Sequence, residues 1–554
     1  MRSERGVEFV RAHVRAGACA TARERGALAV ECAGAVVLAL VFAFVAHAGT
    51  ARASLEFELH DAPTKPKDAR EKPADPRELE KELRAPRPET RRAAVKELAL
   101  LEGRPAFELL VRALEDDDSM VADEAQVALA RVTEEPLLDL LYGRMGLRAK
   151  DPWVRVRVAE AFGRMGGPLD GLALAKSIDA RDEEVARMLL YSLERRLAAK
   201  LDVGDKTKIA REVEAVWRSR VDAEVRGRAL VVLERLDHFK ARPYVDAAAV
   251  DVDPRLRCAA LAAEHGYAEA ERLDRAQRAL QDREASVRSA AIVVLCELAS
   301  RPALLELVHQ MEIEPRSRLK WRILGFLRAR SGEDHGFDFA AWRAWAATVQ
   351  GPWTTGFDPT KRGELGDTRA NLAGLNLISD RVVFLVDFSG STWDTKVGDL
   401  SRKEVLDREL GKALEALPDG TLFNVIPYTN APIPWEKGLV PATKENVARA
   451  RAFFQRCNAR GRGNAFDAAL KALEDPDVDS LVVLTDGVPT GGHHYDMGLF
   501  VDLLAEHDRF RQAAVDSILV DAPKSRVRDW ERLAEKTGGR CVVARFGEEG
   551  GAAK

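Results

Sequence analysis

Cysteine is scarce in this chain, and charge of neither sign predominates. Six cysteines among 554 residues, none in a Cys-x-x-Cys pair, exclude a disulfide framework and a zinc or redox site of that kind. The 85 basic and 89 acidic residues nearly balance, which argues against nucleic-acid binding, because that depends on clustered Lys and Arg. With 46% hydrophobic residues the chain is not disordered throughout, and its length suits about three or four domains.

Common catalytic motifs are also absent. The sequence contains no Gly-x-Ser-x-Gly elbow, no Gly-x-x-x-x-Gly-Lys phosphate loop and no His-Glu-x-x-His helix. A protein without catalytic activity is therefore predicted.

Only one long apolar run occurs, residues 33 to 46, and its 14 residues fall short of the roughly 20 that span a bilayer. A basic stretch precedes this run and Ala46-His47-Ala48 follows it, which is the order of a secretory signal peptide. Residues 1–48 are predicted to be a signal peptide, or a membrane anchor if left uncut, and residues 49–76 a linker rich in proline and charge. We therefore expect an exported protein, periplasmic or on the cell surface, that meets the membrane only through this segment.

A repeated pattern of an acidic residue, an aliphatic residue and often an Arg fills residues 77–331. Its spacing of about 29 to 40 residues suits two helices with their turns, and apolar residues such as Val287, Ala291 and Leu295 follow the helical period. The acidic residue, in places followed by Pro, is expected to cap the second helix. The acidic positions are Asp118, Asp151, Asp182, Asp222, Asp253, Asp282 and Glu314.

This pattern resembles HEAT repeats, which implies an α-solenoid of stacked helix pairs. Such surfaces commonly bind another protein, although a solenoid that serves as a spacer needs no partner. The recurring Asp and Arg are expected to pair with each other, because a ligand site would be local rather than repeated.

Residues 332–375 break the repeat and contain Trp342, Trp345 and Trp353. An exposed tryptophan cluster would be a binding surface. We expect instead that this segment caps the last repeat and packs against the next domain, because Trp342 and Trp345 share a helix face.

Strands and helices alternate over residues 376–549, before a tail at 550–554. This predicts a doubly wound α/β domain with a mainly parallel sheet. We expect residues 77–375 and 376–554 to be separable folding units. Strands are expected at 382–386, 422–428, 481–484, 515–520 and 541–544, and helices near 403–417, 444–456, 465–474, 497–513 and 526–537.

Polar side chains follow two of these strands. Asp387, Ser389 and Ser391 follow the first, and Asp486 follows the strand at 481–484. Their carboxylate and hydroxyl oxygens suit Mg²⁺ or Mn²⁺ better than zinc or copper. The alternative is that Asp387 and the serines only shape the turn.

The Asp387-Phe-Ser-Gly-Ser391 motif, with a later Thr-Asp-Gly, resembles the von Willebrand factor A domain over about 170 residues. The resemblance implies a metal-ion-dependent adhesion site that holds Mg²⁺ or Mn²⁺ through Asp387, Ser389, Ser391 and Asp486, with an acidic group of a protein partner completing the metal shell. The family also supplies a threonine, where this chain has Gly463. Asn464 is therefore expected to turn its amide oxygen toward the metal, or water to fill the gap.

Other polar groups near this motif are open to two interpretations each. His493 and His494, with Asp496, could bind a metal or respond to pH, but a solvated loop is expected. Trp393 could form a wall of the site or pack in the core. A disulfide between Cys457 and Cys541 would need a suitable distance, which the sequence does not supply.

Taken together, the two resemblances imply a bacterial exported protein that binds a protein partner without catalysis, through the repeats and a degenerate metal site. A structural scaffold with a vestigial metal site is the first alternative, made credible by Gly463. A Mg²⁺-dependent hydrolase acting through Asp387 and Asp486 is the second.

Overall fold

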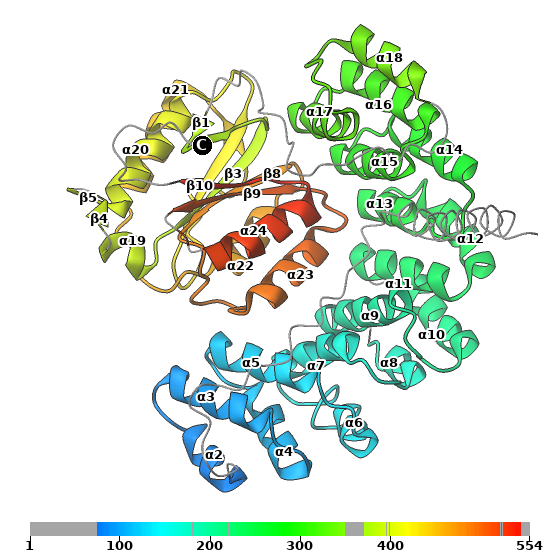
Figure 1. The fold of residues 1–554 in the computed structure, drawn as a ribbon, viewed down its shortest axis with the longest axis vertical. Coiled ribbons are helices and arrows are strands. Elements are labelled where there is room, and N and C mark those ends of the chain that lie inside the picture. Colours follow the sequence, from blue (N-terminus) through cyan, green and yellow to red (C-terminus); the bar gives the residue numbers. More distant parts are fainter. Residues whose placement is uncertain are drawn as a thin grey trace, which may run out of the picture. The chain divides into compact units, whose positions relative to one another are not determined.

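A computed structural model describes residues 75–179, 182–219, 222–349, 371–394, 396–397, 399–520, 522 and 524–544 (Figure 1). The chain divides into two compact units, Met1–Leu59 and His60–Lys554, and every described residue belongs to the second. The predicted signal peptide or anchor, nearly all of the linker, Trp353 and the tail lie outside the described residues. In the part of the chain that is described, no helix is long and apolar enough to cross a membrane.

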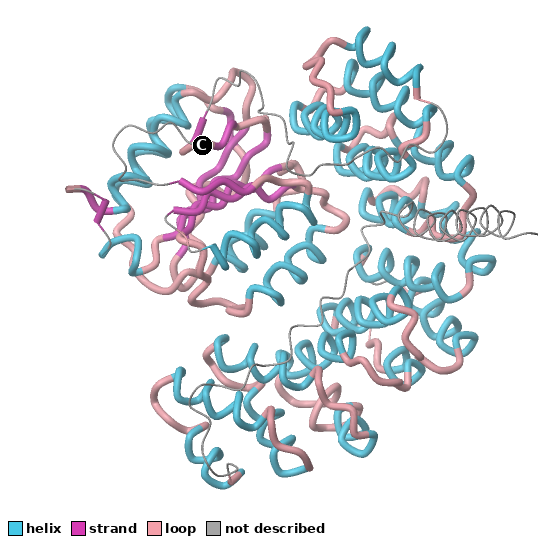
Figure 2. Tube along the Cα trace, viewed as in Figure 1, coloured by secondary structure: helices cyan, strands magenta, loops and turns pink. Residues whose placement is uncertain are grey.

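Helices form the described chain from Pro76 to Thr348, as the repeat pattern predicts (Figure 2). They are α2 (Pro76–Glu82), α3 (Pro88–Leu98), α4 (Arg104–Ala113), α5 (Ser119–Leu129), α6 (Glu135–Leu141), α7 (Pro152–Arg164), α8 (Gly171–Lys176), α9 (Glu183–Ala198), α10 (Lys206–Arg218), α11 (Ala223–Leu236), α12 (His238–Ala248), α13 (Pro254–Ala262), α14 (Glu269–Ala279), α15 (Ala285–Leu298), α16 (Arg301–Ile313), α17 (Ser317–Ser331) and α18 (Phe339–Thr348).

The odd-numbered helices from α3 to α17 form one continuous row, in which each helix contacts the next. We call this row the inner row. Its apolar residues are those that the helical period predicts, and Val287, Ala291 and Leu295 of α15 are almost fully buried. Stacking of this kind makes each repeat depend on its neighbours for a core.

Aspartate side chains start most inner-row helices, as expected. Each accepts a hydrogen bond from a backbone N–H of the first turn, which satisfies a donor that has no partner within the helix. These N-caps are Asp118, Asp151, Asp182, Asp222 and Asp253. Asp282 and Glu314 differ, because each lies two residues before the N-cap and accepts from the N–H of Glu284 or Arg316.

The repeated Arg residues pair with acidic residues of the following repeat, so the predicted ladder is confirmed. Its ion pairs are Arg91–Asp116, Arg155–Asp182, Arg257–Asp282 and Arg288–Glu314, with nitrogen to oxygen distances of 2.6–2.7 Å. Arg226 departs from the pattern, since it donates to the Trp217 carbonyl and lies over the Trp217 ring.

Helix α18 ends the solenoid by packing against α16. Trp342 is fully buried there, donates from Nε1 to the Gly336 carbonyl at 2.9 Å and meets the Trp345 ring edge to face. Helix α18 thus caps the last repeat as expected, whereas the packing of residues 332–375 against the next domain stays a prediction.

The α/β domain contains a six-stranded sheet in the order β10-β9-β8-β3-β6-β7, parallel except for β7 at one edge. The central strands are buried on both faces, as parallel strands between helices are. The strands are β3 (Arg381–Asp387), β6 (Leu422–Tyr428), β7 (Val440–Pro441), β8 (Ser480–Thr485), β9 (Ala514–Val520) and β10 (Cys541–Ala544), with short hairpins β1–β2 (Asn371–Leu372, Leu375–Asn376) and β4–β5 (Lys396–Val397, Leu400–Ser401).

Helices cover both faces of this sheet. They are α19 (Gly390–Asp394), α20 (Arg402–Glu415), α21 (Lys444–Arg456), α22 (Ala465–Leu473), α23 (Met497–Asp508) and α24 (Lys524–Thr537). One hydrophobic cluster joins α20 and α21 to the sheet, and a second joins α22, α23 and α24 to its other face.

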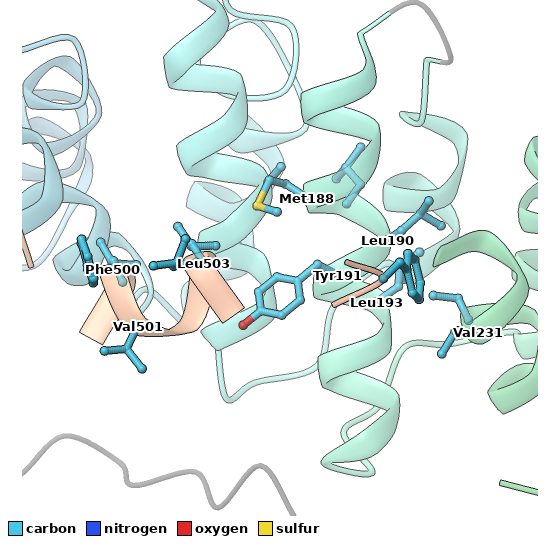
Figure 3. Packing of buried hydrophobic residues seen from close by; sticks show 14 of the residues in the cluster. Met188, Leu190, Tyr191, Leu193, Val231, Phe500, Val501 and Leu503 are labelled. Atoms are coloured by element: carbon cyan, nitrogen blue, oxygen red, sulfur yellow. The ribbon is translucent and has the colours of Figure 1, made fainter. Parts of the chain in front are cut away.

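This second cluster continues into the solenoid without a break. Figure 3 shows α23 beside α9, with Leu503 facing the side of α9 that carries Met188 and Tyr191. Gly227 of α11 lets the Phe510 ring approach closely, because a Cβ there would lie 3.0 Å from that ring. The inner row therefore packs against its own α/β domain.

Charged pairs accompany this apolar contact along the inner row. They are Asp118–Arg462, Glu194–Arg509, Arg195–Asp502, Arg228–Glu506, Arg316–Asp477 and Arg318–Asp516, and Asp123 also lies against His494. Arg318 holds the ladder position of the last repeat, where no further repeat supplies an acid, and Asp516 of β9 takes that place. These contacts argue against the expectation that residues 77–375 and 376–554 are separable folding units.

Candidate functional site

The Asp387 loop begins where β3, a central strand, ends at the carboxyl edge of the sheet. Asp387 is 1% exposed; its Oδ1 accepts from the Ser389 N–H at 2.8 Å and its Oδ2 from the Thr485 hydroxyl at 2.9 Å. The hydroxyl oxygens of Ser389 and Ser391 lie 3.1 Å apart. The Ser391 hydroxyl donates to Asp486 Oδ2 at 2.5 Å. Asp387, Ser389, Ser391 and Asp486 thus lie together, and we call them the carboxylate–serine cluster.

Burial and a neighbouring negative charge both raise the pKa of Asp387. Burial, followed by repulsion from Asp486, raises the pKa of Asp387 to about 6, although hydrogen bonds from Ser389 and Thr485 oppose the shift. Two carboxylates held together in this way favour a cation between them.

Arg402 supplies a positive charge at the same place. It is the first residue of α20, it is 8% exposed, and its Nη1 lies 3.5 Å from Asp486 Oδ2. Neither Arg402 nor Thr485 was among the residues singled out from the sequence. The Thr-Asp-Gly motif could have indicated Thr485, but no motif points to Arg402.

The middle loop places Gly463 directly against Asp387. A Cβ at Gly463 would lie 3.2 Å from both Asp387 carboxylate oxygens, which is the position that the resemblance assigns to a threonine. The Gly463 N–H donates to the Thr490 hydroxyl at 2.7 Å, so the middle loop also contacts the loop that follows Asp486.

Asn464 does not join the carboxylate–serine cluster through any contact that the structure records. It is the N-cap of α22, where its Oδ1 accepts from the Asp467 N–H, and its Nδ2 donates to the Asn430 carbonyl and to Asp467. The expected turn of this amide toward a metal is therefore wrong for this conformation, because helix capping already engages both amide atoms.

The loop of His493, His494 and Asp496 is only partly solvated, because His494 is buried, contrary to expectation. His494 is 5% exposed and lies against Asp123 of α5, which also accepts from the backbone N–H groups of Tyr495 and Asp496. The His493 ring stacks on Trp153 of α7, with centroids 4.0 Å apart. We call residues 486–496 the third loop.

Trp393 packs rather than lining an open site. Its ring meets Phe388 edge to face, and the Arg460 and Lys403 cations lie over it. Cys457 and Cys541 are free thiols that pack on opposite faces of the sheet, which explains why they do not form a disulfide.

The chemistry of the cluster suits a hard divalent cation, because two carboxylates and two hydroxyls present only oxygen. Among the residues that the structure describes, no group of three or more His, Cys, Asp and Glu is arranged to hold a metal. A metal at the cluster would therefore depend on the serine hydroxyls and on water.

Comparison with known proteins supports the HEAT-repeat part of the fold. A family described as HEAT repeats matches residues 76–146. Human inter-alpha-trypsin inhibitor heavy chain H4 is 33% identical over 131 residues, which cover 22% of this chain and 13% of that protein. This chain thus spans about an eighth of the length of that curated relative.

Solved structures also match, among them the following two. A von Willebrand factor type A protein from Catenulispora acidiphila has a TM-score of 0.26 at 17% identity, over 29% of this chain and 38% of that one. The Deinococcus radiodurans RO (RSR) protein has a TM-score of 0.18 at 16% identity, over 83% of this chain and 88% of that one. The fold itself rests on the repeats and the sheet order: the chain combines a HEAT-repeat region with a von Willebrand factor A-like domain.

Proposed function

We propose that this protein binds a protein partner without catalysis, through a divalent metal ion, Mg²⁺ or Mn²⁺, held at the carboxylate–serine cluster. Asp387, Ser389, Ser391 and Asp486 would hold the ion, and an acidic side chain of the partner would complete its shell. The observation that carries this proposal is the continuous chain of contacts from Asp387 through both serines to Asp486. The relatives that contain von Willebrand factor A domains support a role in protein interaction.

The inner row is not available to such a partner in this conformation, because it packs against the α/β domain. The partner is therefore expected at the carboxyl edge of the sheet. The sequence led us to expect binding surfaces on both the repeats and the metal site. We now propose only the metal site as the surface that binds the partner.

Calorimetric titration of the full chain with MgCl₂ and MnCl₂ tests the metal site. We expect binding in the wild type and none in Asp387→Ala. The matched control is Asp419→Asn, an exposed carboxylate that precedes β6 at the opposite edge of the sheet. Equal binding by wild type and Asp387→Ala would contradict the proposal.

A structural scaffold with a vestigial site is the second candidate, and two observations favour it. Gly463 supplies no hydroxyl, and the Arg402 guanidinium already lies beside Asp486. The scaffold would be supported if neither ion bound the wild type or a folded Gly463→Thr variant.

A further inference from the structure

Helix α5 of the solenoid carries two aspartates that reach two separate loops around the carboxylate–serine cluster. Asp118, its N-cap, is 6% exposed, and Asp123, further along the helix, is fully buried. Neither belongs to the α/β domain. The HEAT region thus supplies carboxylates at the edge of a site that lies in another part of the chain.

Asp118 contacts the middle loop. Its Oδ2 accepts from Arg462 Nη2 at 2.7 Å, and Arg462 precedes the glycine whose Cβ position lies 3.2 Å from Asp387. Arg462 also lies against the third loop, because a Cβ at Gly491 would lie 2.7 Å from the Arg462 Cβ. A single ion pair therefore restrains both loops where they approach the cluster.

Asp123 contacts the third loop at the start of α23. Its Oδ2 accepts from the N–H groups of Tyr495 and Asp496 at 2.6 and 2.9 Å. Its Oδ1 meets Arg157 Nη1 at 2.5 Å and His494 Nδ1 at 3.3 Å. A carboxylate that accepts N–H groups at the start of a helix is favoured by the helix dipole, and here that carboxylate comes from a distant repeat.

The third loop joins these contacts to the site, since it begins at Asp486 and ends at Asp496, the N-cap of α23. Asp123 holds its far end, while the Gly463 N–H bonds to Thr490 in its middle. The loop that carries Asp486 is therefore contacted from outside its own domain.

We propose, resting on the metal site proposed above, that α5 positions that site: Asp118 and Asp123 hold the middle and third loops so that Gly463 and Asp486 stay beside Asp387. They act as positioning residues and do not touch the metal. Support of this kind preorganises a site and raises its affinity. Loss of contact between α5 and these loops would weaken metal binding without removing a ligand.

The test compares three full-length variants in Mn²⁺ titration calorimetry: Asp118→Asn, Asp123→Asn and Arg462→Gln. Changes to residues that orient metal ligands commonly cost about 10-fold to 100-fold in affinity, and we expect a loss in that range. Arg462→Gln keeps the test informative if Asp123→Asn fails to fold, because the Arg462 side chain is 44% exposed.

Glu194→Gln is the matched control, because it breaks the Arg509 contact of the same interface at the other end of α23. Wild-type affinity in the three loop variants, or an equal loss in Glu194→Gln, would overturn the inference. Hydrogen exchange of residues 461–464 and 486–496 supplies a readout that needs no metal. If the wild type binds no metal, the proposed function fails, but the exchange experiment still tests the positioning by α5. Faster exchange in the loop variants but not in Glu194→Gln would support this positioning. Unchanged exchange in the loop variants would overturn it.

Discussion

Gly463 occupies the position on which the strength of the candidate metal site depends. It has no side chain to offer, yet it lies against both Asp387 oxygens. It is not among the residues with positive φ, so its backbone accepts a residue with a Cβ. The close approach of 3.2 Å requires Asp387 to shift by a few tenths of an ångström.

Replacing Gly463 by Thr should strengthen Mg²⁺ binding, because it adds a hydroxyl beside Asp387. A hydrogen bond to a charged group contributes about 1.5–3 kcal/mol, and a contribution of that size corresponds to about 10-fold to 100-fold in affinity. Thermal unfolding in millimolar MgCl₂ measures the gain, since a metal at 100 times its dissociation constant adds about 2.7 kcal/mol to the free energy of unfolding. Gly463→Ala is the control, because it adds a methyl group without a hydroxyl. Equal Mg²⁺ affinity in the Thr and Ala variants would show that the hydroxyl does not contribute to binding.

Arg402 is the second residue that sets the affinity, because its cation competes for Asp486. At an effective dielectric constant of about 20, two unit charges 3.5 Å apart interact by about 5 kcal/mol. Arg402→Gln should therefore bind Mn²⁺ at least about tenfold more tightly than wild type, which calorimetry measures directly. Arg408→Gln, an exposed arginine of the same helix, should leave the affinity unchanged. Weaker binding in Arg402→Gln would show that the guanidinium supports the site instead.

At the scale of elements, the loop before α23 was expected to be solvated, but its end packs against α5 through Asp123. Burial disfavours the charge of Asp123, but attraction and hydrogen bonds from His494 and Arg157 outweigh it and lower the pKa of Asp123 to about 2. A buried aspartate that remains charged thus stabilises the folded state.

Asp123→Asn should lose a pH-dependent part of this stability. Because the folded pKa is lower than the unfolded value of 3.8, the contribution is complete above about pH 4 and disappears as the pH falls toward about 2. The shift corresponds to about 2 kcal/mol in the free energy of unfolding. Urea unfolding from pH 2 to 7 should show the gap between wild type and variant closing in that window. Asp117→Asn, an exposed neighbour, is the control, and a gap that stays constant with pH would refute this assignment.

At the scale of the molecule, the solenoid packs against its own α/β domain. Ion pairs and one continuous apolar cluster join the two parts within the unit His60–Lys554. In this conformation the inner row therefore offers no open curved surface.

Export is a prediction that belongs to the whole chain and rests on its sequence alone. Residues 1–60 fused to a reporter that is active only outside the cytoplasm should yield activity in a bacterial host, because a basic stretch, an apolar run and Ala-x-Ala follow in order. Deleting residues 33–46 from the same fusion should abolish it. An intact but silent fusion in the cytoplasm would count against export, and recovery only in membranes would favour an uncut anchor.

Local patterns in the sequence determined the repeats, the aspartate N-caps, the ladder and the five parallel strands of the sheet, but not its antiparallel edge strand β7. These features depend on the period of apolar residues and on contacts between neighbours, which a sequence displays directly. Helix α21 begins and ends where predicted, whereas α23 ends at Asp508, five residues early, with Gln512 in a positive-φ turn beyond it. The Asp387, Ser389, Ser391 and Asp486 cluster was also predictable, because parallel strands end at one edge of a sheet.

Only the tertiary structure decided what surrounds that cluster. The groups that contact Arg402, Asp118 and Asp123 lie about 80 to 370 residues away in the sequence. No regular spacing in the sequence indicates such pairs. Asn464 was expected to turn toward a metal and His494 to lie in a solvated loop, but a helix terminus engages Asn464 and a distant carboxylate lies against His494. These polar contacts form because the solenoid packs against its own α/β domain. That packing depends on surfaces built from many segments, so no single segment of the sequence reveals it.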